Sequence, residues 1–416
     1  MREMKDSGIE WIGEIPVGWE VLRNKNSFTC TKELVGEKSS DTQLLSLTTR
    51  GVRKKDINNA EGKLPESFDT YQYVKENDII MCLFDLDCSA VFSGISFYDG
   101  MISPAYKVLT CTDRTFPKYA GYWFNYISHD RKFNHYAKNI RYTLSYEEFS
   151  TLPIIVPPYK DQHRISTYLD TKCEKIDSII ARQQEVIEKL KAYKLSVITE
   201  AVTKGLNLDV GMKDSGVEWI GDVPEHWETV RIKWLLNERK ERSEYGTEEP
   251  LSMSQKYGLI PTKEMDIIPN MASTYVGAKI VYQDDLVFNK LKAHLGVFSV
   301  SKYFGLVSPD YAVYFSSGKA NLKYLEYLFK TPQCILEFRK KSSGIADGLT
   351  RLYTSGLFSI YCPFPSKSEQ QQIADYLDKK CSAIDSAIAK KQAIIEKLTA
   401  YKKSLIYEVV TGKKEV

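Results

Sequence analysis

Residues 162–203 read QHRISTYLDTKCEKIDSIIARQQEVIEKLKAYKLSVITEAVT, and residues 370–411 repeat this stretch as QQQIADYLDKKCSAIDSAIAKKQAIIEKLTAYKKSLIYEVVT. The two stretches are 208 residues apart, half of the 416-residue chain, and 25 of their 42 positions are identical. Neither stretch contains Gly or Pro, the residues that weaken helices most. The repeated stretch therefore predicts two matching long helices, one in each half of the chain.

Apolar residues in each stretch recur at alternating steps of four and three, the heptad seam of a coiled coil. Each seam predicts a helix of roughly 60 Å at about 1.5 Å per residue. Both seams are interrupted at matched polar positions, Gln183 with Lys391 and Lys194 with Lys402. A polar seam residue fixes the register of a helix on one defined partner, so we expect the two helices to pack antiparallel with internal pseudo-twofold symmetry. The seam residues are Leu169, Cys173, Ile176, Ile180, Ile187, Leu190, Val197 and Ala201, matched by Leu377, Cys381, Ile384, Ile388, Ile395, Leu398, Leu405 and Val409.

The composition is that of an ordinary globular protein, with 43% hydrophobic and 12% aromatic residues, enough for two or three domains. Residues 1–16 carry charges where a signal peptide would need an apolar run, and no stretch approaches the length of a membrane span. We therefore expect a cytoplasmic protein. The eight cysteines form no CxxC pair and the five histidines lack HExxH spacing, so we expect no metal and no cofactor.

A second repeat opens each half. Residues 4–20, MKDSGIEWIGEIPVGWE, match residues 212–228, MKDSGVEWIGDVPEHWE, at 12 of 17 positions. Aromatic residues at fixed spacing in both copies are typical of packing against a scaffold, so we expect them to dock on the long helices. The signature contains four of the six tryptophans: Trp11, Trp19, Trp219 and Trp227.

Between signature and helix, each half carries about 140 residues that match only in fragments, such as GMISPAYKV from Gly100 and GLVSPDYAV from Gly305. The fragments mix strand patterns with short helices, so the fold class is α+β: two α+β domains joined by the two helices. Pro-rich joints precede the helices, which we expect to be capped by Asp161 and by a Ser368/Gln371 capping box. The expected bounds are 1–161 and 209–369 for the domains, and 162–208 and 370–416 for the helices.

Motifs of catalysis are missing from the sequence. Residues 156–159, VPPY, superficially match the motif of amino-methyltransferases, but valine cannot accept a hydrogen bond from an exocyclic amine. We interpret this stretch as a helix joint. The sequence contains no GxxxxGK[ST] phosphate loop and no ExK tripeptide of nuclease type after Asp310. A catalytic function is therefore the weaker hypothesis.

The signature KDSGxEWIGxxPxxW, a Pro joint, and the pattern QxxIxxYLDxKCxxID…IEKLxAYKxSxIxE occur twice and enclose two divergent domains. This framework resembles the specificity subunit of a type I restriction-modification system over the whole chain. The resemblance implies a non-catalytic subunit that selects the DNA sequence for a complex in which other chains methylate and cleave. Each domain would be a target-recognition domain that reads one half of a bipartite site, and the helices would set the spacing.

The resemblance implies double-stranded DNA and methyltransferase (modification) subunits as partners, with two equivalent seats for the latter, and restriction (endonuclease or translocase) subunits as a further partner. No membrane partner is implied. Residues that either form the methyltransferase seats or only close the internal packing are Trp11, Trp19, Tyr193, Trp219, Trp227 and Tyr401.

Residues for DNA contact should be Lys and Arg for phosphates, and forked or amide side chains for base edges. A Gly-rich basic segment before the Pro joint is typical of the family; residues 339–351, RKKSSGIADGLTR, match it, whereas the first half departs from it with Asn139. Our candidates in the first domain are Arg50, Arg53, Lys54, Lys55, Arg131, Lys132, Lys138, Asn139 and Arg141. In the second they are Lys256, Lys290, Lys292, Arg339, Lys340, Lys341, Ser342, Ser343 and Arg351.

Two other functions compete with DNA reading. Residues 21–161 carry 18 Lys/Arg against 17 Asp/Glu, whereas residues 229–369 carry 19 against 14. The near-neutral first domain favours a two-lobed protein-binding adaptor, in which the helices only space two protein-binding lobes. A standalone methyltransferase or nuclease would need motifs that the sequence lacks.

Overall fold

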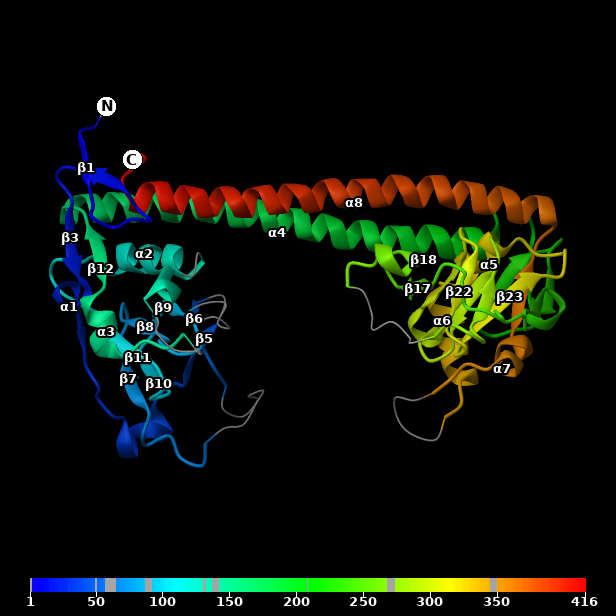
Figure 1. Cartoon of the computed structure of the whole chain (residues 1–416), viewed down its shortest axis with the longest axis horizontal. Coiled ribbons are helices and arrows are strands. Elements are labelled where there is room, and N and C mark those ends of the chain that lie inside the picture. The colour runs from blue at the N-terminus through cyan, green and yellow to red at the C-terminus, as the bar shows by residue number, and fades with distance from the viewer. Residues whose placement is uncertain are drawn as a thin grey trace. The chain divides into compact units, whose positions relative to one another are not determined.

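The computed structural model describes residues 2–48, 51–56, 65–86, 92–129, 132–136, 142–207, 209–267, 274–344 and 350–416. The chain divides into two compact units. Unit 1 contains residues 1–184 and 392–416, and unit 2 contains residues 185–391 (Figure 1). Each unit therefore consists of one α+β domain and one half of each long helix.

The long helices are α4 (Tyr159–Lys204) and α8 (Lys367–Val410), of 46 and 44 residues. Both predicted caps were wrong. Asp161 lies inside the first turn of α4, where its carboxylate is 3.0 Å from Arg164. Helix α8 is capped by Ser366, whose hydroxyl accepts a hydrogen bond from the Glu369 amide at 3.3 Å. The Ser-x-x-Glu pattern two residues earlier than the predicted Ser-x-x-Gln supplies the cap.

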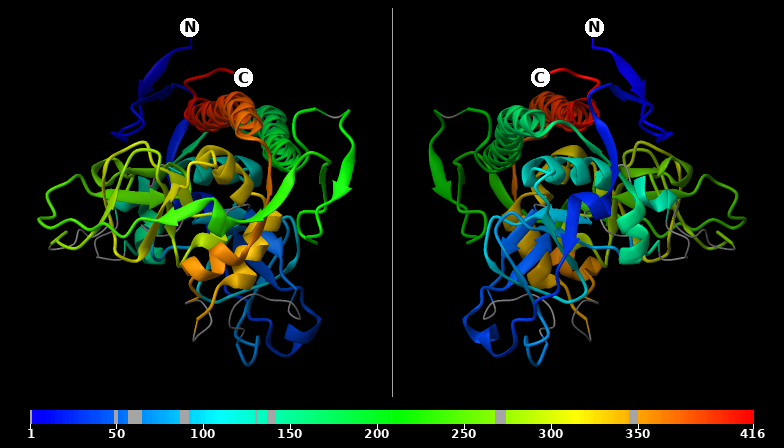
Figure 2. Two further views of the ribbon diagram at one scale, coloured as in Figure 1. Left: turned by 90° about the vertical axis from the view of Figure 1, so that its right-hand side faces the viewer. Right: turned by 90° about the vertical axis from the view of Figure 1, so that its left-hand side faces the viewer.

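Helices α4 and α8 run antiparallel within each unit, as the seam predicts (Figure 1 and Figure 2). In unit 1 the start of α4 shares a hydrophobic core with the end of α8, and in unit 2 the end of α4 shares one with the start of α8. The seam residues involved are Leu169, Cys173, Ile176, Leu405 and Val409 in unit 1, and Val197, Ala201, Leu377 and Cys381 in unit 2.

The two seam lysines make ion pairs across the helix pair. In unit 2, Lys194 Nζ lies 2.7 Å from the Asp385 carboxylate, and in unit 1, Lys402 Nζ lies 2.7 Å from the Asp177 carboxylate. These pairs are related by the 208-residue repeat. Because the pairs are partly exposed, each contributes at most about 1 kcal/mol, but a shifted register would separate both.

The two α+β domains repeat the same pairing of strands. A four-stranded antiparallel sheet has the order β4-β11-β8-β9 in unit 1 and β16-β23-β20-β21 in unit 2, and four two-stranded pairs surround each sheet. Apart from the long helices, the elements of unit 1 are β1 (Met4–Asp6), β2 (Glu14–Pro16), β3 (Glu20–Arg23), α1 (Asn24–Ser27), β4 (Phe28–Cys30), η1 (Gly36–Asp41), β5 (Leu45–Thr48), β6 (Gly51–Lys54), β7 (Gln72–Val74), β8 (Ile79–Met81), β9 (Ser93–Ile95), β10 (Gly100–Ile102), β11 (Lys107–Cys111), α2 (Pro117–His129), η2 (Lys132–His135), α3 (Tyr146–Thr151) and β12 (Pro153–Val156).

Unit 2 follows the same plan with one difference after the sheet. Strand β11 of unit 1 is followed by helix α2, whereas β23 of unit 2 is followed by two helices, α5 and α6. Its elements are β13 (Met212–Asp214), β14 (Asp222–Pro224), β15 (Glu228–Arg231), η3 (Ile232–Trp234), β16 (Leu236–Glu238), β17 (Leu251–Ser254), β18 (Gly258–Pro261), η4 (Thr262–Glu264), β19 (Lys279–Val281), β20 (Leu286–Asn289), η5 (Ala293–Leu295), β21 (Phe298–Val300), β22 (Gly305–Val307), β23 (Tyr311–Ser316), α5 (Leu322–Phe329), α6 (Pro332–Lys341), α7 (Thr354–Ser359) and β24 (Tyr361–Phe364). The predicted α+β fold class with two long antiparallel helices is confirmed.

The tryptophan signatures pack on helix ends. Trp19 is buried in the core of unit 1 beside the end of α8, where a Cβ added at Gly412 would lie 3.0 Å from its ring. Trp227 is buried in unit 2 beside the end of α4, where a Cβ added at Gly205 would lie 3.3 Å from its ring. Both glycines have positive φ and end their helices in the left-handed conformation. Trp19 and Trp227 therefore pack on the helices, as the sequence predicted.

A buried tyrosine in each domain holds the end of a long helix. The Tyr119 hydroxyl lies 2.9 Å from the Ile155 carbonyl oxygen and 3.1 Å from that of Val410, the last residue of α8. The repeat places Tyr324 in the same way, 3.1 Å from the Val202 carbonyl oxygen of α4. The last carbonyls of a helix have no partner within it, so these hydroxyls satisfy groups that burial would otherwise leave without a donor. Burial raises the pKa of both tyrosines well above its ordinary value.

The joint before each long helix is closed by a buried glutamine. The side-chain oxygen of Gln162 accepts a hydrogen bond from the Phe116 amide at 2.7 Å, and that of Gln370 accepts one from the Asn321 amide at 2.8 Å. Each glutamine also donates to a carbonyl five residues earlier. The first turn of each helix is thereby bonded to the domain that precedes it. No helix within the described ranges could cross a membrane.

Replacing Tyr119 with Phe should lower the free energy of unfolding by about 1–3 kcal/mol, because two buried carbonyl oxygens lose their donor. Tyr401→Phe is the matched control, since Tyr401 is 51% exposed and its loss of a hydroxyl should cost less than about 0.5 kcal/mol. Urea unfolding measures both values. Above about pH 10 the unfolded tyrosine ionises while the buried one stays protonated, so the wild type should lose stability more steeply with rising pH than Tyr119→Phe. Equal stability of the two variants would contradict this role.

Candidate nucleic-acid interface

The cationic residues after β20 lie in a tight turn of unit 2. Strand β20 ends at Asn289, whose side-chain oxygen accepts a hydrogen bond from the Leu291 amide at 3.1 Å. Lys290 follows and is half-buried, whereas Lys292 is exposed and begins the short helix η5. Gly296 ends η5 with a φ of +75°, a conformation that glycine adopts without strain. The turn therefore presents two lysines in a fixed backbone.

The basic segment before the second Pro joint meets this turn. Its two described ends pair as an antiparallel bridge: the Ser343 amide donates to the Arg351 carbonyl at 3.0 Å, and the Arg351 amide donates back at 2.9 Å. The Leu352 amide then donates to the Lys290 carbonyl at 3.0 Å. Three predicted residues, Lys290, Ser343 and Arg351, are thus brought together from positions up to 61 apart in the sequence. The Arg351 guanidinium lies 3.7 Å from Asp310, an exposed pair.

Three further predicted cations occupy the last turn of α6. Arg339, Lys340 and Lys341 are all exposed. Cations there interact favourably with the carbonyl end of the helix. Lys340 Nζ is 2.7 Å from Glu337, so part of its charge is already compensated. Ser342, the next residue, donates its hydroxyl to the Phe338 carbonyl at 2.7 Å and so continues the helix end into the basic segment.

Lys256 lies at the turn of the β17–β18 hairpin. Its ammonium group contacts the Tyr257 hydroxyl and lies 3.4 Å from Asp266. The neighbouring Gln255 donates its amide to the Leu295 carbonyl at 2.7 Å, which fastens the hairpin to η5. The hairpin therefore borders the Lys290–Lys292 turn, although Lys256 itself is engaged within the hairpin.

In unit 1, Arg53 and Lys54 lie on β6 and are exposed, and Lys55 follows them. Lys54 Nζ is 4.8 Å from the centre of the Tyr98 ring. Lys132 lies in η2 with its Nζ 5.8 Å from the Trp11 ring, in the N-terminal signature. The remaining predicted residues of this domain lie outside the described residues: Arg50, Arg131, Lys138, Asn139 and Arg141.

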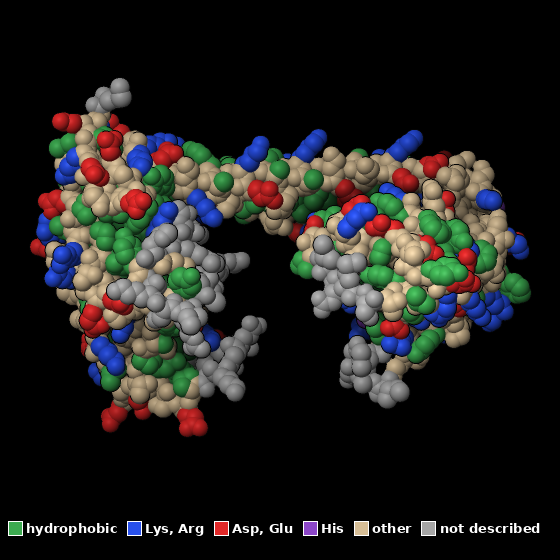
Figure 3. Space-filling view, in the orientation of Figure 1, with side chains coloured by type: hydrophobic (Ala, Val, Ile, Leu, Met, Phe, Trp, Pro, Cys, Tyr) green, Lys and Arg blue, Asp and Glu red, His purple; other side chains and the backbone are tan. Residues whose placement is uncertain are grey.

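Charged side chains of both signs are interspersed on the face of the protein shown in Figure 3. This mixture agrees with the formal net charge of +3 over the whole chain. The site in unit 2 is therefore defined by a local grouping of cations and not by a broad field.

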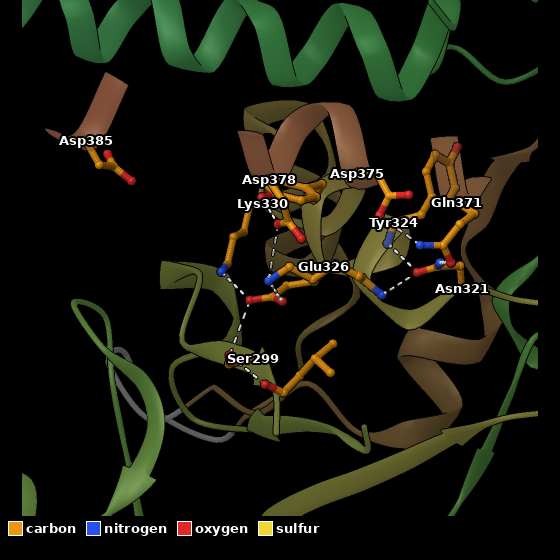
Figure 4. A network of polar contacts seen from close by, with 12 residues as sticks. Ser299, Asn321, Tyr324, Glu326, Lys330, Gln371, Asp375, Asp378 and Asp385 are labelled. Carbon is orange, nitrogen blue, oxygen red and sulfur yellow. Dashed lines mark hydrogen bonds and ion pairs between the residues drawn. The ribbon is translucent and has the colours of Figure 1, made fainter. Parts of the chain in front are cut away.

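A buried ionic network fixes the sheet edge that carries the unit 2 site (Figure 4). The Glu326 carboxylate of α5 is 95% buried and lies 3.1 Å from Lys323 and within hydrogen-bond distance of Lys330. The Ser299 hydroxyl of β21 donates to the same carboxylate at 3.3 Å. Burial by itself raises the pKa of Glu326, but the two lysines outweigh burial and hold that pKa below its ordinary value. The charged network therefore ties β21, next to β20, to α5.

In each unit, a tyrosine of the α+β domain is bonded to the long helix that follows that domain. The Tyr327 hydroxyl donates to Asp378 of α8 at 2.6 Å, and Tyr122 donates to Asp170 of α4 at 2.8 Å. Lys118 adds an ion pair to Asp170 at 2.8 Å in unit 1. Burial, followed by the neighbouring acidic and thiol groups, raises the pKa of both tyrosines. Each domain is thus positioned by polar contacts within the first four turns of its own helix.

The six predicted partner residues separate into two groups. Trp19 and Trp227 are buried, and Trp227 donates its indole N–H to Glu369 at 2.9 Å, so neither presents a surface to another protein. Trp11 and Trp219 are partly buried against the unit cores. Tyr193 and Tyr401, related by the repeat, are about half exposed at 52% and 51%. Only the two tyrosines combine exposure with a matched position on both helices.

Sequence reasoning overlooked three polar residues that line or support the unit 2 site: Gln255, Asn289 and Lys279. Gln255 and Asn289 directly precede the predicted Lys256 and Lys290. Their position next to candidate DNA-contacting lysines could have identified them as site residues. Lys279 had no such signal because it is isolated in sequence within a buried strand. Within the described residues, no group of three or more His, Cys, Asp or Glu residues could hold a metal ion.

Comparison with known proteins finds a sequence relative among restriction enzymes. No family model matches the chain. The type I restriction enzyme MjaVIII specificity subunit of Methanocaldococcus jannaschii is 24% identical over 296 residues, covering 64% of this chain and 63% of that protein. The matched region therefore spans somewhat less than two thirds of this relative.

Two solved structures share the fold along nearly the whole chain. A chain in a structure of the complex assembly and conformational transition of the type I R-M system has a TM-score of 0.70 at 12% identity, covering 96% of this chain and 99% of its own. The HsdS subunit from Thermoanaerobacter tengcongensis has a TM-score of 0.52 at 13% identity, covering 96% and 98%. The chain thus has a type I restriction enzyme specificity subunit as its sequence relative and the fold of HsdS.

Proposed function

We propose that this protein is the DNA-recognition subunit of a type I restriction-modification complex, in which each α+β domain reads one half of a bipartite DNA site. The reading domains are residues 1–161 and 209–369, and the spacer helices are residues 162–208 and 370–416. Methylation and cleavage belong to other subunits. The observation that carries this proposal is the duplicated HsdS-like fold, whose second copy brings Lys290, Ser343 and Arg351 together through backbone hydrogen bonds.

The duplication supports a reader of two unlike half-sites. The two domains share strand order and pairing but differ in the residues on their loops. A shared framework lets two modules bind DNA in the same orientation, and divergent loops let them read different bases. Helices α4 and α8 each run without interruption from one unit into the other, which supports their role as spacers.

The grouping in unit 2 suits both parts of DNA recognition. Lys290 and Lys292 supply point charges for phosphates, and Arg351 supplies a forked donor for a guanine edge or a phosphate. The Arg351–Asp310 pair is exposed and worth at most about 1 kcal/mol, so Arg351 can exchange Asp310 for DNA. The Ser343 hydroxyl is an additional donor, and the Ser342 hydroxyl, which donates to the Phe338 carbonyl, can accept. In unit 1 the corresponding contacts are assigned to Arg53, Lys54, Lys55 and Lys132. The other candidates of this domain, which lie outside the described residues, are Arg50, Arg131, Lys138, Asn139 and Arg141.

Two equivalent seats for methyltransferase subunits follow from the repeat. Tyr193 and Tyr401 stand at matched positions on α4 and α8 and are half exposed, as aromatic anchors of protein interfaces are before binding. Trp11 and Trp219 border the helix ends and remain partly accessible. Restriction subunits are a further partner of the assembled complex.

The alternative function is a two-lobed adaptor that binds proteins. The near balance of charge in the first domain, 18 Lys/Arg against 17 Asp/Glu, favours it. The local grouping of Lys290, Lys292 and Arg351 favours DNA instead, because protein interfaces are generally depleted of lysine.

Lys290→Ala should weaken DNA binding by the complex with its methyltransferase and reduce the slope of log affinity against log salt by about 1, because one phosphate contact is lost. Lys189→Ala is the control: Lys189 is an exposed lysine on α4 that pairs with Glu185 of the same helix. Fluorescence anisotropy over a range of salt concentrations measures both slopes. An unchanged slope in Lys290→Ala would remove this residue from the interface.

Exchanging residues 21–161 for the matching region of another such protein should change one half of the methylated sequence and leave the other half as it was. The physical reason is that each domain carries its own contacts and its own core. Methylome mapping of a host that expresses the hybrid measures the outcome. An adaptor would leave the methylated sequence unchanged, and this result would support the alternative function.

A further inference from the structure

The helix that follows the basic segment begins differently in the two units. In unit 1, helix α3 is capped by its own sequence: the Ser145 hydroxyl accepts from the Glu148 amide, and the Glu148 carboxylate accepts from the Ser145 amide. In unit 2, the residue at the cap of α7 is Tyr353, which makes no side-chain cap bond. The start of α7 is held instead by Thr354, whose hydroxyl donates to the Glu238 carboxylate at 2.9 Å.

A close backbone contact explains the difference. Gly356 stands in unit 2 where the repeat places Glu148 in unit 1. A Cβ at Gly356 would lie 2.8 Å from the carbonyl oxygen of Lys341, at the end of α6. A glutamate therefore does not fit there, and a capping box cannot form. Glu238, from the distant strand β16, supplies the anchor that the local sequence cannot.

Glu238 in turn faces a buried lysine. Lys279 of β19 is 93% buried, and its Nζ donates to the Tyr311 carbonyl at 2.7 Å and lies 3.7 Å from the Glu238 carboxylate. Burial, then the nearby Lys290 and Arg242, lower the pKa of Lys279, whereas Glu238 opposes them. Removing one member of such a pair would leave the other as an uncompensated charge in a poorly solvated place.

In unit 1 a neutral side chain takes the place of Lys279. Gln72 occupies the position of Lys279, because both begin the strand that pairs with the Gly100 or Gly305 strand in the same register. Its side-chain amide donates to the Tyr106 carbonyl at 2.7 Å, as Lys279 does to Tyr311. The repeat places Cys30 where unit 2 has Glu238. Unit 2 therefore has a lysine and a glutamate where unit 1 has a glutamine and a cysteine.

The Lys279–Glu238–Thr354 network touches both sides of the unit 2 site. Thr354 is three residues beyond Arg351, whose backbone pairs with Ser343. Tyr311, the acceptor of Lys279, follows Asp310, the ion-pair partner of Arg351, and pairs in the sheet with Asn289, the residue before Lys290. The Thr354 hydroxyl also lies 3.0 Å from that of Tyr314.

We propose that Lys279, Glu238 and Thr354 form a positioning network that holds Lys290, Ser343 and Arg351 in the geometry that reads the second half-site. This inference rests on the proposed function. The three residues do not touch DNA; they act through the backbone of α7 and of the turn after β20. They are specificity-determining residues for the half-site read by unit 2 alone.

The test uses the full-length protein in complex with its methyltransferase. Thr354→Val removes the donor at nearly constant volume, and Thr354→Ser keeps it. Affinity is measured for the cognate site and for sites with one mismatch in either half. Thr354→Val should reduce discrimination about tenfold in the second half, the size expected for one hydrogen bond to a charged group, and leave the first half unchanged. Thr354→Ser should behave as the wild type.

Discrimination unchanged in Thr354→Val, or lost equally in both halves, would overturn the proposal, because a general loss of stability affects both readings. Amide hydrogen exchange of the DNA-free complex supplies an independent measurement: Ser343 and Arg351 should exchange faster in Thr354→Val than in Thr354→Ser. Equal exchange would also overturn the proposal. If the wild-type complex bound no DNA while Thr354→Val still exchanged faster than Thr354→Ser, the proposed function and the reading role would both be overturned, and only the structural link between Thr354 and the Ser343–Arg351 bridge would stand.

Discussion

The structure depends on the burial of the end of each long helix inside an α+β domain. The end of α8 lies in the domain at the start of the chain, and the end of α4 lies in the domain that follows it. The last turn of α8 is covered by Trp19 and bonded by Tyr119, and the last turn of α4 is covered by Trp227 and bonded by Tyr324. Unit 1 is therefore complete only when the final 25 residues, 392–416, return to the domain at the start of the chain. Antiparallel packing of the helices is the condition for both units.

The two units show how one framework accepts different chemistry. The groups that fasten domain to helix are repeated: Gln162 and Gln370 at the joints, and Asp170 and Asp378 on the helices. The groups behind the candidate reading surface are not repeated, since Gln72 is replaced by Lys279. A change of a buried neutral residue to a charged one requires a second change nearby. In unit 2 the Glu238 carboxylate, 3.7 Å from Lys279 Nζ, supplies the compensating charge that a buried lysine requires.

Periodicity and repetition made the helices, their antiparallel packing and the seam lysines predictable, because heptads and internal repeats are properties of sequence alone. The caps at Asp161 and Ser368 were wrong because several serines and acids near a helix start compete, and only backbone geometry selects among them. Lys290, Ser343 and Arg351 were chosen by residue type, and the fold brings them together through backbone bonds that no pattern encodes. Lys279 escaped prediction because its role depends on Glu238, 41 residues earlier.

The central claim is that the helix pair sets the distance between two reading domains. The most direct measurement inserts one heptad into both helices, after Gln184 and after Lys391, and maps the methylated sequence. Seven residues add about 10.5 Å, close to three base pairs at about 3.4 Å each. An insertion in one helix alone is the control, since it breaks the Lys194–Asp385 and Lys402–Asp177 register. Unchanged half-sites with a gap about three base pairs longer are predicted; unchanged half-sites with an unchanged gap would contradict the account.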